Sequence, residues 1–408
     1  MRIAMVSEHA NPLAVLGGAD AGGQNVHVGA LSAQLAARGH EVTVYSRWTS
    51  PDVPSRVQTP DGYAVEHVPV GPPEDVPKDD LLQYMPAFAR YLESRWGERP
   101  VDVVHAHFWM SGVASTRAAR HVNVPVVQTF HALGTVKRRQ QGDRDTSPPE
   151  RIGLERRLCQ RVDHIVATCT DEVDELREMG LRPGRATVVP CGVDTDLFRP
   201  LETGGGPDRP SRGATAPTLL SIGRLVERKG VGNVIEALVE LPDAHLVVAG
   251  GPTPERLDVD EDVRRLRGIA QRAGVADRVT FLGGVGRDEV PRLMNEADVV
   301  VAVPWYEPFG IVPVEAMACG RPVVGSAVGG LLDTVLPGLT GELVPPRRPD
   351  VIASALRTLL ADPERRAAYG RSGRDRAVAL YRWACVAERT EDVYARVVAS
   401  ASREAVAP

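Results

Sequence analysis

Cysteine and aromatic residues are scarce in this chain. Its five cysteines are scattered over 408 residues, and no two have the spacing of a zinc site or of a redox-active pair. We therefore expect free thiols in a reducing compartment. Aromatic residues make up only 5% of the chain, which argues against the stacking platforms that bind single-stranded nucleic acid.

Long apolar segments are also missing. No apolar run approaches the roughly 20 residues that a helix needs to cross a bilayer. The first residues, MRIAMVSEHANP, lack the basic stretch and the long apolar region of a signal peptide and are typical of a first strand. With a net charge of only −5, the composition favours neither nucleic acid nor a membrane surface as a partner. We predict a cytoplasmic enzyme without an integral membrane segment.

Short apolar runs do occur, and they alternate with helical patterns along the whole chain. This alternation is typical of βαβ units, and the Val- and Ile-rich runs fit strands of a parallel sheet covered on both faces. In the first half, such runs lie at residues 2–7, 41–45, 101–107, 125–130, 164–168 and 186–190. In the second half, they lie at residues 218–223, 244–250, 278–283, 297–304, 321–326 and 341–345.

The repetition predicts an α/β protein with two Rossmann-like, doubly wound parallel-sheet domains. We expect an N-terminal domain over residues 1–198 and a C-terminal domain over residues 217–383. The segment 199–216 between them is rich in Gly, Pro and charge and has the composition of a linker, and residues 384–408 should form a last helix. Because open parallel sheets bind ligands beyond the carboxyl ends of their strands, two such domains facing each other would enclose a deep cleft.

A glycine-rich loop follows the first predicted strand. It ends at Gly22 and Gly23, which precede a helical pattern and would let backbone N–H groups approach a phosphate closely. The spacing is not the GxGxxG pattern of dinucleotide-binding domains, so a nicotinamide cofactor is not supported. A tight glycine turn without a ligand is an equally good interpretation of this loop alone.

Two basic residues follow the first strand of the second half. Arg224 and Lys229 lie in the segment SIGRLVERKG and offer a guanidinium and an ammonium group that suit a diphosphate. Neutralising a nucleotide diphosphate as it leaves is the main electrostatic task in sugar transfer. On its own, such a pair is more often part of a solvated basic turn.

Two acidic residues follow the predicted strand at 297–304. Glu307 and Glu315 form an E-x7-E pattern, with one carboxylate in a loop and the other in the helix that follows Gly310. Carboxylates accept hydrogen bonds from pairs of hydroxyls, so this arrangement can hold a sugar ring and a ribose. The backbone N–H groups of residues 309–311 at the helix start can also cap a phosphate.

Histidines follow predicted strands of the first half. His131 ends one of them, and its ring can donate a hydrogen bond to a sugar hydroxyl or to a developing charge. His105 and His107 share one strand face and, with His9 or His27, raise the question of a metal ion. No carboxylate or cysteine partner has convincing spacing, so we predict no metal site.

Several segments of the sequence resemble those of a known family. SIGRLVERKG, EPFGIVPVEAMACG and PCGVDTDLF are similar to segments of the retaining GT-B glycosyltransferases of family 4. The GGQNVHV loop narrows the match to the subgroup that contains sucrose-phosphate synthases and mycothiol glycosyltransferases. HAHFWMSG at 105–112 and YRWACVAERTEDVY near the end extend the resemblance over nearly the whole chain.

The resemblance implies an enzyme that moves a sugar, glucose or N-acetylglucosamine, from a nucleotide-sugar to a small polar acceptor. UDP is the implied carrier, and no metal or other cofactor is implied. Transfer would proceed with retention at the anomeric carbon through an oxocarbenium-like transition state. The family also implies that the last helix, residues 384–408, packs back on the N-terminal domain, and that the protein forms a homodimer.

The resemblance assigns roles to matching positions. Arg224 and Lys229 would bind the donor diphosphate, and His131 would lie beside the reacting centre. Glu307 would hold hydroxyls of the donor sugar, and Glu315 would bind the ribose. The complete implied donor set is Gly23, Arg224, Lys229, Glu307, Phe309, Gly310, Ile311 and Glu315.

The acceptor is less well indicated. A basic group in the first half suits a phosphorylated acceptor, although ordinary surface basicity explains it equally well; this group comprises Lys78, Lys137, Arg138, Arg139 and Arg151. In mycothiol glycosyltransferases a Lys, a Tyr, a Thr and an Arg hold the acceptor phosphate. Lys78 and Arg151 match two of these, whereas Phe108 and Ala132 stand where the two hydroxyl donors are expected. The implied acceptor set is Asn25, Lys78, Phe108, Ala132 and Arg151.

Because both hydroxyl donors are replaced, inositol phosphate need not be the acceptor. Another phosphosugar, a cyclitol or a secondary metabolite fits equally. Two other classes of function stay open on this architecture, namely another enzyme and a protein without catalysis. A nucleotide-sugar epimerase would leave the basic segments at 71–90 and 132–152 without a purpose, and a phosphorylase would need a lysine for pyridoxal phosphate that no local pattern supports. A non-catalytic sugar-nucleotide sensor would not need the intact set of Glu307, Glu315, Arg224, Lys229 and His131.

Overall fold

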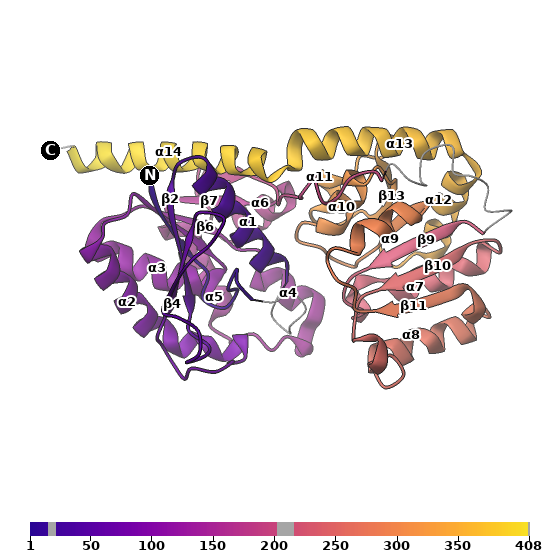
Figure 1. Cartoon of the computed structure of the whole chain (residues 1–408), viewed down its shortest axis with the longest axis horizontal. Coiled ribbons are helices and arrows are strands. Elements are labelled where there is room, and N and C mark those ends of the chain that lie inside the picture. Colours follow the sequence, from indigo (N-terminus) through magenta and orange to yellow (C-terminus); the bar gives the residue numbers. More distant parts are fainter. Residues whose placement is uncertain (15–21, 202–215, 407–408) are drawn as a thin grey trace. The chain divides into compact units, whose positions relative to one another are not determined.

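The computed structural model describes residues 1–14, 22–201 and 216–406 of the chain. The chain divides into two compact units (Figure 1). Unit 1 comprises Met1–Cys191 together with Trp383–Pro408, and unit 2 comprises Gly192–Arg382. Each unit contains one sheet with helices packed against it, so the predicted α/β class with two parallel-sheet domains is confirmed.

The sheet of unit 1 has the strand order β3-β4-β2-β1-β5-β6-β7-β8. All neighbouring strands pair in parallel except β3, which is antiparallel to β4. The strands are β1 (Arg2–Val6), β2 (Glu41–Arg47), β3 (Arg56–Gln58), β4 (Ala64–Val68), β5 (Val103–His107), β6 (Val126–Thr129), β7 (His164–Ala167) and β8 (Ala186–Val188).

The helices of unit 1 include the last helix of the chain. They are α1 (Gly23–Ala37), α2 (Met85–Glu98), α3 (Trp109–Val122), α4 (Gly134–Gln141), α5 (Arg151–Arg161), α6 (Thr170–Glu178) and α14 (Trp383–Val406). Figure 1 shows α14, in yellow, lying along unit 1 beside elements from the start of the chain. Val386, Val393 and Val397 share one face of α14 and are buried in the same cluster as Ile3 and Val42.

Unit 2 contains a six-stranded, all-parallel sheet with the order β11-β10-β9-β12-β13-β14. The strands are β9 (Thr218–Ile222), β10 (His245–Ala249), β11 (Val279–Gly283), β12 (Val299–Ala302), β13 (Val323–Ser326) and β14 (Gly341–Val344). The α-helices are α7 (Val231–Ala237), α8 (Glu261–Arg272), α9 (Val290–Glu296), α10 (Ile311–Ala318), α11 (Leu331–Thr334), α12 (Pro349–Ala361) and α13 (Pro363–Arg376).

Every strand range predicted from the sequence overlaps an observed strand, but β3 and β4 were missed. The segment AVEHV of β4 carries a glutamate and a histidine, so it lacks the continuous apolar run of a buried strand. The burial of Glu66 becomes possible because Arg56 and Arg95 form ion pairs with its carboxylate at 2.7 and 2.6 Å. The charged partners that allow Glu66 to be buried in β4 therefore come from other elements of the fold.

The strand order fixes where ligands can bind. In unit 1 the order reverses between β1 and β5, and in unit 2 it reverses between β9 and β12. At such a switch point the loops leave the sheet in opposite directions and open a crevice beyond the carboxyl ends of the strands. The residues after β1, β5, β9 and β12 therefore stand where a ligand would bind.

Two predicted segments fall largely outside the described residues. They are the linker at 199–216, of which residues 202–215 are not described, and the part of the glycine-rich loop at residues 15–21. Within the ranges that are described, no helix has both the length and the apolar character needed to cross a membrane.

Candidate functional site

The loops after β9 and β12 meet at the switch point of unit 2. Lys229, from the first loop, donates a hydrogen bond and forms an ion pair through Nζ with the carboxylate of Glu307, from the second. The backbone N–H of Trp305 also donates to the carbonyl of Arg228 at 2.8 Å. Two residues that are 78 positions apart and were predicted to serve one site are thus in direct contact.

Glu307 is surrounded by positive charge. Arg228 is half-buried, and burial lowers the pKa of its guanidinium, an effect that the charge of Glu307 opposes. Arg224 follows β9 and is exposed. Its positive charge lies close enough to Arg228 to lower the pKa of the Arg228 guanidinium further. Sequence reasoning missed Arg228, although it stands in the same SIGRLVERKG segment. Arg224, Arg228 and Lys229 thus place three cations in the loop that meets Glu307, which favours an anionic ligand.

Glycines allow the two loops to approach each other. Gly230 has a φ of +75°, and a Cβ atom there would lie 2.0 Å from the carbonyl oxygen of Val303. On the other side of the Glu307 loop, the N–H of Gly330 donates to the Glu307 carbonyl at 3.0 Å. A Cβ on Gly329 would lie 2.1 Å from that same oxygen. Sequence reasoning missed this Gly329–Gly330 pair, whose only signal was its position after a predicted strand.

The start of α10 follows directly from Glu307. Phe309 is buried, with its ring 6.2 Å from that of Tyr381, and this contact anchors the loop. Gly310 has a φ of +89° and turns the chain into α10, so that the N–H groups at Gly310 and Ile311 stand at a helix N-terminus. This local geometry is the one that the sequence predicted for capping a phosphate.

Glu315 lies on α10 and is almost fully buried, with its side chain only 7% exposed. Arg287 is a charged partner, and its Nη1 lies 3.3 Å from the carboxylate. Burial raises the pKa of Glu315 to about 7, and Arg287 only partly opposes this rise. A buried carboxylate held in an ionisable state at the edge of a site is costly for the fold, which points to a binding role.

We expect the Glu315→Gln variant to gain thermal stability relative to the unsubstituted protein as the pH rises. The pKa of Glu315 is raised from 4.5 to about 7 by folding, so its stabilising proton is fully present below pH 4.5 and is lost as the pH rises through about 7. Glutamine does not titrate. The difference in Tm should therefore move by a few degrees in favour of the variant between about pH 5 and pH 8, on the order of 1–3 kcal/mol.

The control for this measurement is Glu296→Gln, because Glu296 pairs with Arg292 on the surface and both side chains are 55% exposed. That variant should show no such pH-dependent difference. A Glu315→Gln variant whose Tm ran parallel to that of the unsubstituted protein at every pH would contradict the raised pKa.

In unit 1, polar side chains gather where β1, β5 and β6 end. Glu8 and His9 follow β1, and His9 Nδ1 lies 2.7 Å from the buried Glu8 carboxylate. Phe108 follows β5 with a φ of +77°, and its ring meets that of His9 edge-on at 4.8 Å. His131 follows β6 with a φ of +60°. Sequence reasoning did not single out Glu8, whose burial is visible only in the fold.

Four histidines form a cluster next to this edge, which we call the histidine cluster: His27, His105, His107 and His131. Their ring centroids are 4.1 to 5.6 Å apart for the pairs in contact. Burial lowers the pKa of each ring, to about 4 for His27 and about 3 for His105, so all four are neutral at pH 7. Among the described residues, no group of three or more His, Cys, Asp or Glu side chains is arranged to hold a metal ion.

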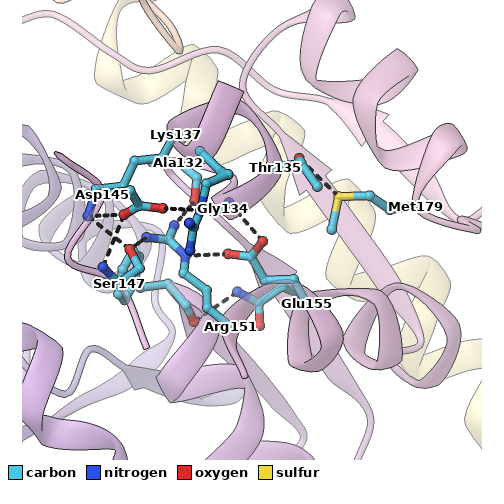
Figure 2. Close-up of polar contacts among 12 residues, drawn as sticks. Ala132, Gly134, Thr135, Lys137, Asp145, Ser147, Arg151, Glu155 and Met179 are labelled. Carbon is cyan, nitrogen blue, oxygen red and sulfur yellow. Dashed lines mark hydrogen bonds and ion pairs between the residues drawn. The ribbon is translucent and has the colours of Figure 1, made fainter. Parts of the chain in front are cut away.

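Four of the residues predicted on the acceptor side lie together. The guanidinium of Arg151 is 5.1 Å from the Phe108 ring centroid, and the ammonium of Lys78 is 5.8 Å from it. Arg151 Nη2 donates to the carbonyl of Ala132 at 2.7 Å (Figure 2). The fifth predicted residue, Asn25, lies in the first turn of α1, where its side-chain amide donates to the Asn11 carbonyl at 2.9 Å.

The predicted basic group is largely neutralised within the fold. Arg151 is buried, and its Nε donates to Glu155 at 2.8 Å, as Figure 2 shows. Lys137 lies 3.0 Å from Asp145, which also lies 3.4 Å from Arg138. Arg139 pairs with a further carboxylate, that of Glu175, at 2.7 Å. These contacts support local structure, so the number of cations in this segment overstates its capacity to bind a phosphate.

The sequence matches two family profiles. The one described as Glycosyltransferase Family 4 matches residues 21–197, and the one described as Glycosyl transferases group 1 matches residues 208–376. The D-inositol 3-phosphate glycosyltransferase of Kineococcus radiotolerans is 37% identical, covering 99% of this chain and 97% of that protein. The protein of the same name from Xylanimonas cellulosilytica is 38% identical, covering 97% of this chain and 96% of that one.

Solved structures show the same architecture. Sucrose-phosphate synthase from Thermosynechococcus elongatus has a TM-score of 0.87 and 32% identity, and the match covers 98% of this chain and 99% of that one. Anabaena Alr3699/HepE, solved in complex with UDP and glucose, has a TM-score of 0.73 and 20% identity, with 97% of this chain and 99% of that one covered. The second likeness is one of fold alone.

Proposed function

This chain belongs to glycosyltransferase family 4, and we propose that it transfers a hexose from a UDP-linked sugar donor to a small polar acceptor. The resemblance stated from the sequence motifs is thereby confirmed, as are the GT-B fold and the class of enzyme. The hexose we propose is glucose or N-acetylglucosamine. Retention at the anomeric carbon and a homodimeric state stay predictions.

The observation that carries the proposal is the contact of Lys229 with Glu307 at the switch point of unit 2. We assign the diphosphate of the donor to Lys229 and Arg224, supported by Arg228 and by the N–H groups at the start of α10. A bound diphosphate would draw the ammonium of Lys229 away from Glu307. The freed carboxylate could then accept hydrogen bonds from two hydroxyls of the donor sugar.

Catalysis would consist mainly of charge stabilisation. As the bond between the anomeric carbon and the phosphate oxygen breaks, negative charge grows on the departing UDP, and Lys229 and Arg224 would stabilise it. The sugar takes on oxocarbenium character at the same time. We assign Glu315 to the ribose, and we place His131 beside the reacting centre as a neutral hydrogen-bonding group.

On the acceptor side, we propose that the edge formed by Lys78, Phe108, Ala132 and Arg151 binds the acceptor. The relatives named above act on D-inositol 3-phosphate. In this chain Phe108 and Ala132 offer no side-chain hydroxyl, and Arg151 already bonds Glu155 and the Ala132 carbonyl. We therefore propose an acceptor that is a different phosphosugar, a cyclitol or a secondary metabolite.

Thermal stabilisation by nucleotides tests the donor assignment. A ligand that binds only the folded protein raises Tm with its concentration, so UDP should raise Tm by several degrees when present at about a hundred times its Kd. ADP and GDP should raise it less, and the conjugate of UDP with the correct hexose should raise it further. No shift with any nucleotide or conjugate would contradict the assignment and favour a different function.

Once the donor is known, transfer can be measured on a matched pair of acceptors. D-inositol 3-phosphate and myo-inositol differ only in the phosphate, so the ratio of their kcat/KM values reports how much the enzyme gains from it. Efficient transfer to D-inositol 3-phosphate, with a strong preference for it over myo-inositol, would contradict the proposal that the acceptor is a different compound while leaving the donor assignment intact.

A further inference from the structure

The histidine cluster leaves one nitrogen of His131 without a partner. His131 Nε2 lies 3.0 Å from Nδ1 of His107, at the end of β5, and the planes of the two rings differ by only 25°. His131 Nδ1 has no hydrogen bond to any of the residues that the structure describes. His131 as a residue is half-buried, whereas His107 is fully buried. The nitrogen available to a substrate is therefore Nδ1.

The hydrogen bond between the two rings restricts where their protons lie. A neutral imidazole carries one proton, and a bond between two such rings needs one N–H and one bare nitrogen. Either His107 donates from Nδ1, which places the proton of His131 on its own Nδ1, or His131 donates from Nε2, which leaves its Nδ1 bare. In the second case the proton of His107 must lie on Nε2.

Burial of His107 decides between these arrangements. His107 Nε2 is buried and has no hydrogen-bond partner among the described residues. A proton on that atom would be a buried donor without an acceptor, which is rarer and costlier than an unused lone pair. The favoured arrangement has the proton of His107 on Nδ1, donating to His131 Nε2.

The ring of His107 is held in place by a second fixed histidine. Thr129 Oγ1 donates to the carbonyl of Val166 at 3.0 Å, so it accepts from Nε2 of His105 at 2.8 Å. The hydroxyl of Tyr394, on α14, then donates to Nδ1 of His105 at 2.6 Å. The ring of His105 lies 4.1 Å from that of His107, with an interplanar angle of 36°. The last helix thus contributes to the rigidity of the cluster.

We propose that His107 is a positioning residue that fixes His131 in the tautomer with its proton on Nδ1. His131 then presents a hydrogen-bond donor to an oxygen of the substrates and does not act as a general base. The inference rests on the proposed function, in which His131 lies beside the reacting centre. It adds to that function the role of His107, which determines that His131 donates, and does not accept, the hydrogen bond to the substrate.

Two substitutions of His107 distinguish this role from simple packing. Asparagine places its amide N–H near the position of the imidazole Nδ1, whereas glutamine places it near Nε2. His107→Asn should therefore retain most of the turnover, and His107→Gln should lower kcat about tenfold or more with little change in KM for the donor. Comparable Tm values for the two variants would show that both are folded. An equal loss of kcat in both would overturn the proposal.

The tautomer can be read directly in the unsubstituted protein. Two-bond proton–nitrogen correlation spectra of 15N-histidine-labelled protein distinguish the two tautomers, and the His131→Gln variant assigns the signal. A proton on His131 Nδ1 supports the proposal, and a proton on Nε2 overturns it, whatever the variants do. If the spectrum showed the proton on Nδ1 but the protein transferred sugar from no nucleotide-sugar donor, the proposed function would fail and the positioning of His131 would stand.

Discussion

Replacing Glu307 by glutamine should lower kcat by about a hundredfold or more while leaving the affinity for UDP unchanged or slightly higher. The carboxylate of Glu307 forms an ion pair with Lys229 in the free protein, so it competes with a diphosphate for the same ammonium group. Glutamine keeps the shape but removes this competition. It also removes the charged acceptor that the sugar hydroxyls need as positive charge develops on the ring. Initial-rate kinetics and calorimetric titration with UDP measure the two effects separately.

The opposite pattern is expected for Lys229→Ala, in which both the affinity for UDP and the turnover should fall because the diphosphate loses its ammonium partner. Glu296→Gln serves as the control for Glu307→Gln, since Glu296 pairs with Arg292 on an exposed face. If Glu307→Gln weakened UDP binding as much as Lys229→Ala does, Glu307 would act on the nucleotide and the assignment to the sugar would be wrong.

Most strands of both sheets could be predicted because buried parallel strands are continuous Val- and Ile-rich runs that are visible locally. β4 could not be predicted in this way. Its Glu66 is buried only because Arg95, from α2, and Arg56 reach its carboxylate. Partners of this kind are supplied by elements that lie far away in sequence, so no local pattern contains them.

The same distinction applies to the candidate sites. The segments with Lys229 and Glu307 could be predicted because each follows a strand and carries its own chemistry, but their direct contact follows only from the neighbouring positions of β9 and β12. Conversely, Arg151 was placed in a basic group suited to a phosphorylated acceptor, because the sequence does not show which carboxylate lies beside it in the fold. In the fold, Glu155 lies one turn further along α5 and accepts a hydrogen bond from Nε of Arg151.

Gly330→Ala should lower the Tm of the protein by several degrees and reduce kcat/KM for the donor by about a hundredfold, although residue 330 carries no functional group. A Cβ atom at this position would lie 2.4 Å from Cα and 2.5 Å from the carbonyl oxygen of Phe309, so the backbone must move. The N–H of Gly330 also donates to the carbonyl of Glu307, so the shift is transmitted to that residue. Thermal unfolding and donor kinetics on the same preparation test both parts.

Gly97→Ala is the matched control, because Gly97 lies in α2 and a Cβ there would meet nothing within 4 Å. Alanine favours helix over glycine, so this variant should be stabilised by about 0.5–1 kcal/mol with unchanged kinetics. A Gly330→Ala protein with lowered Tm but unchanged donor kinetics would mean that the loop relaxes without moving the carboxylate. Loss of both, with Gly97→Ala unaffected, would show that the backbone behind Glu307 determines where its charge lies.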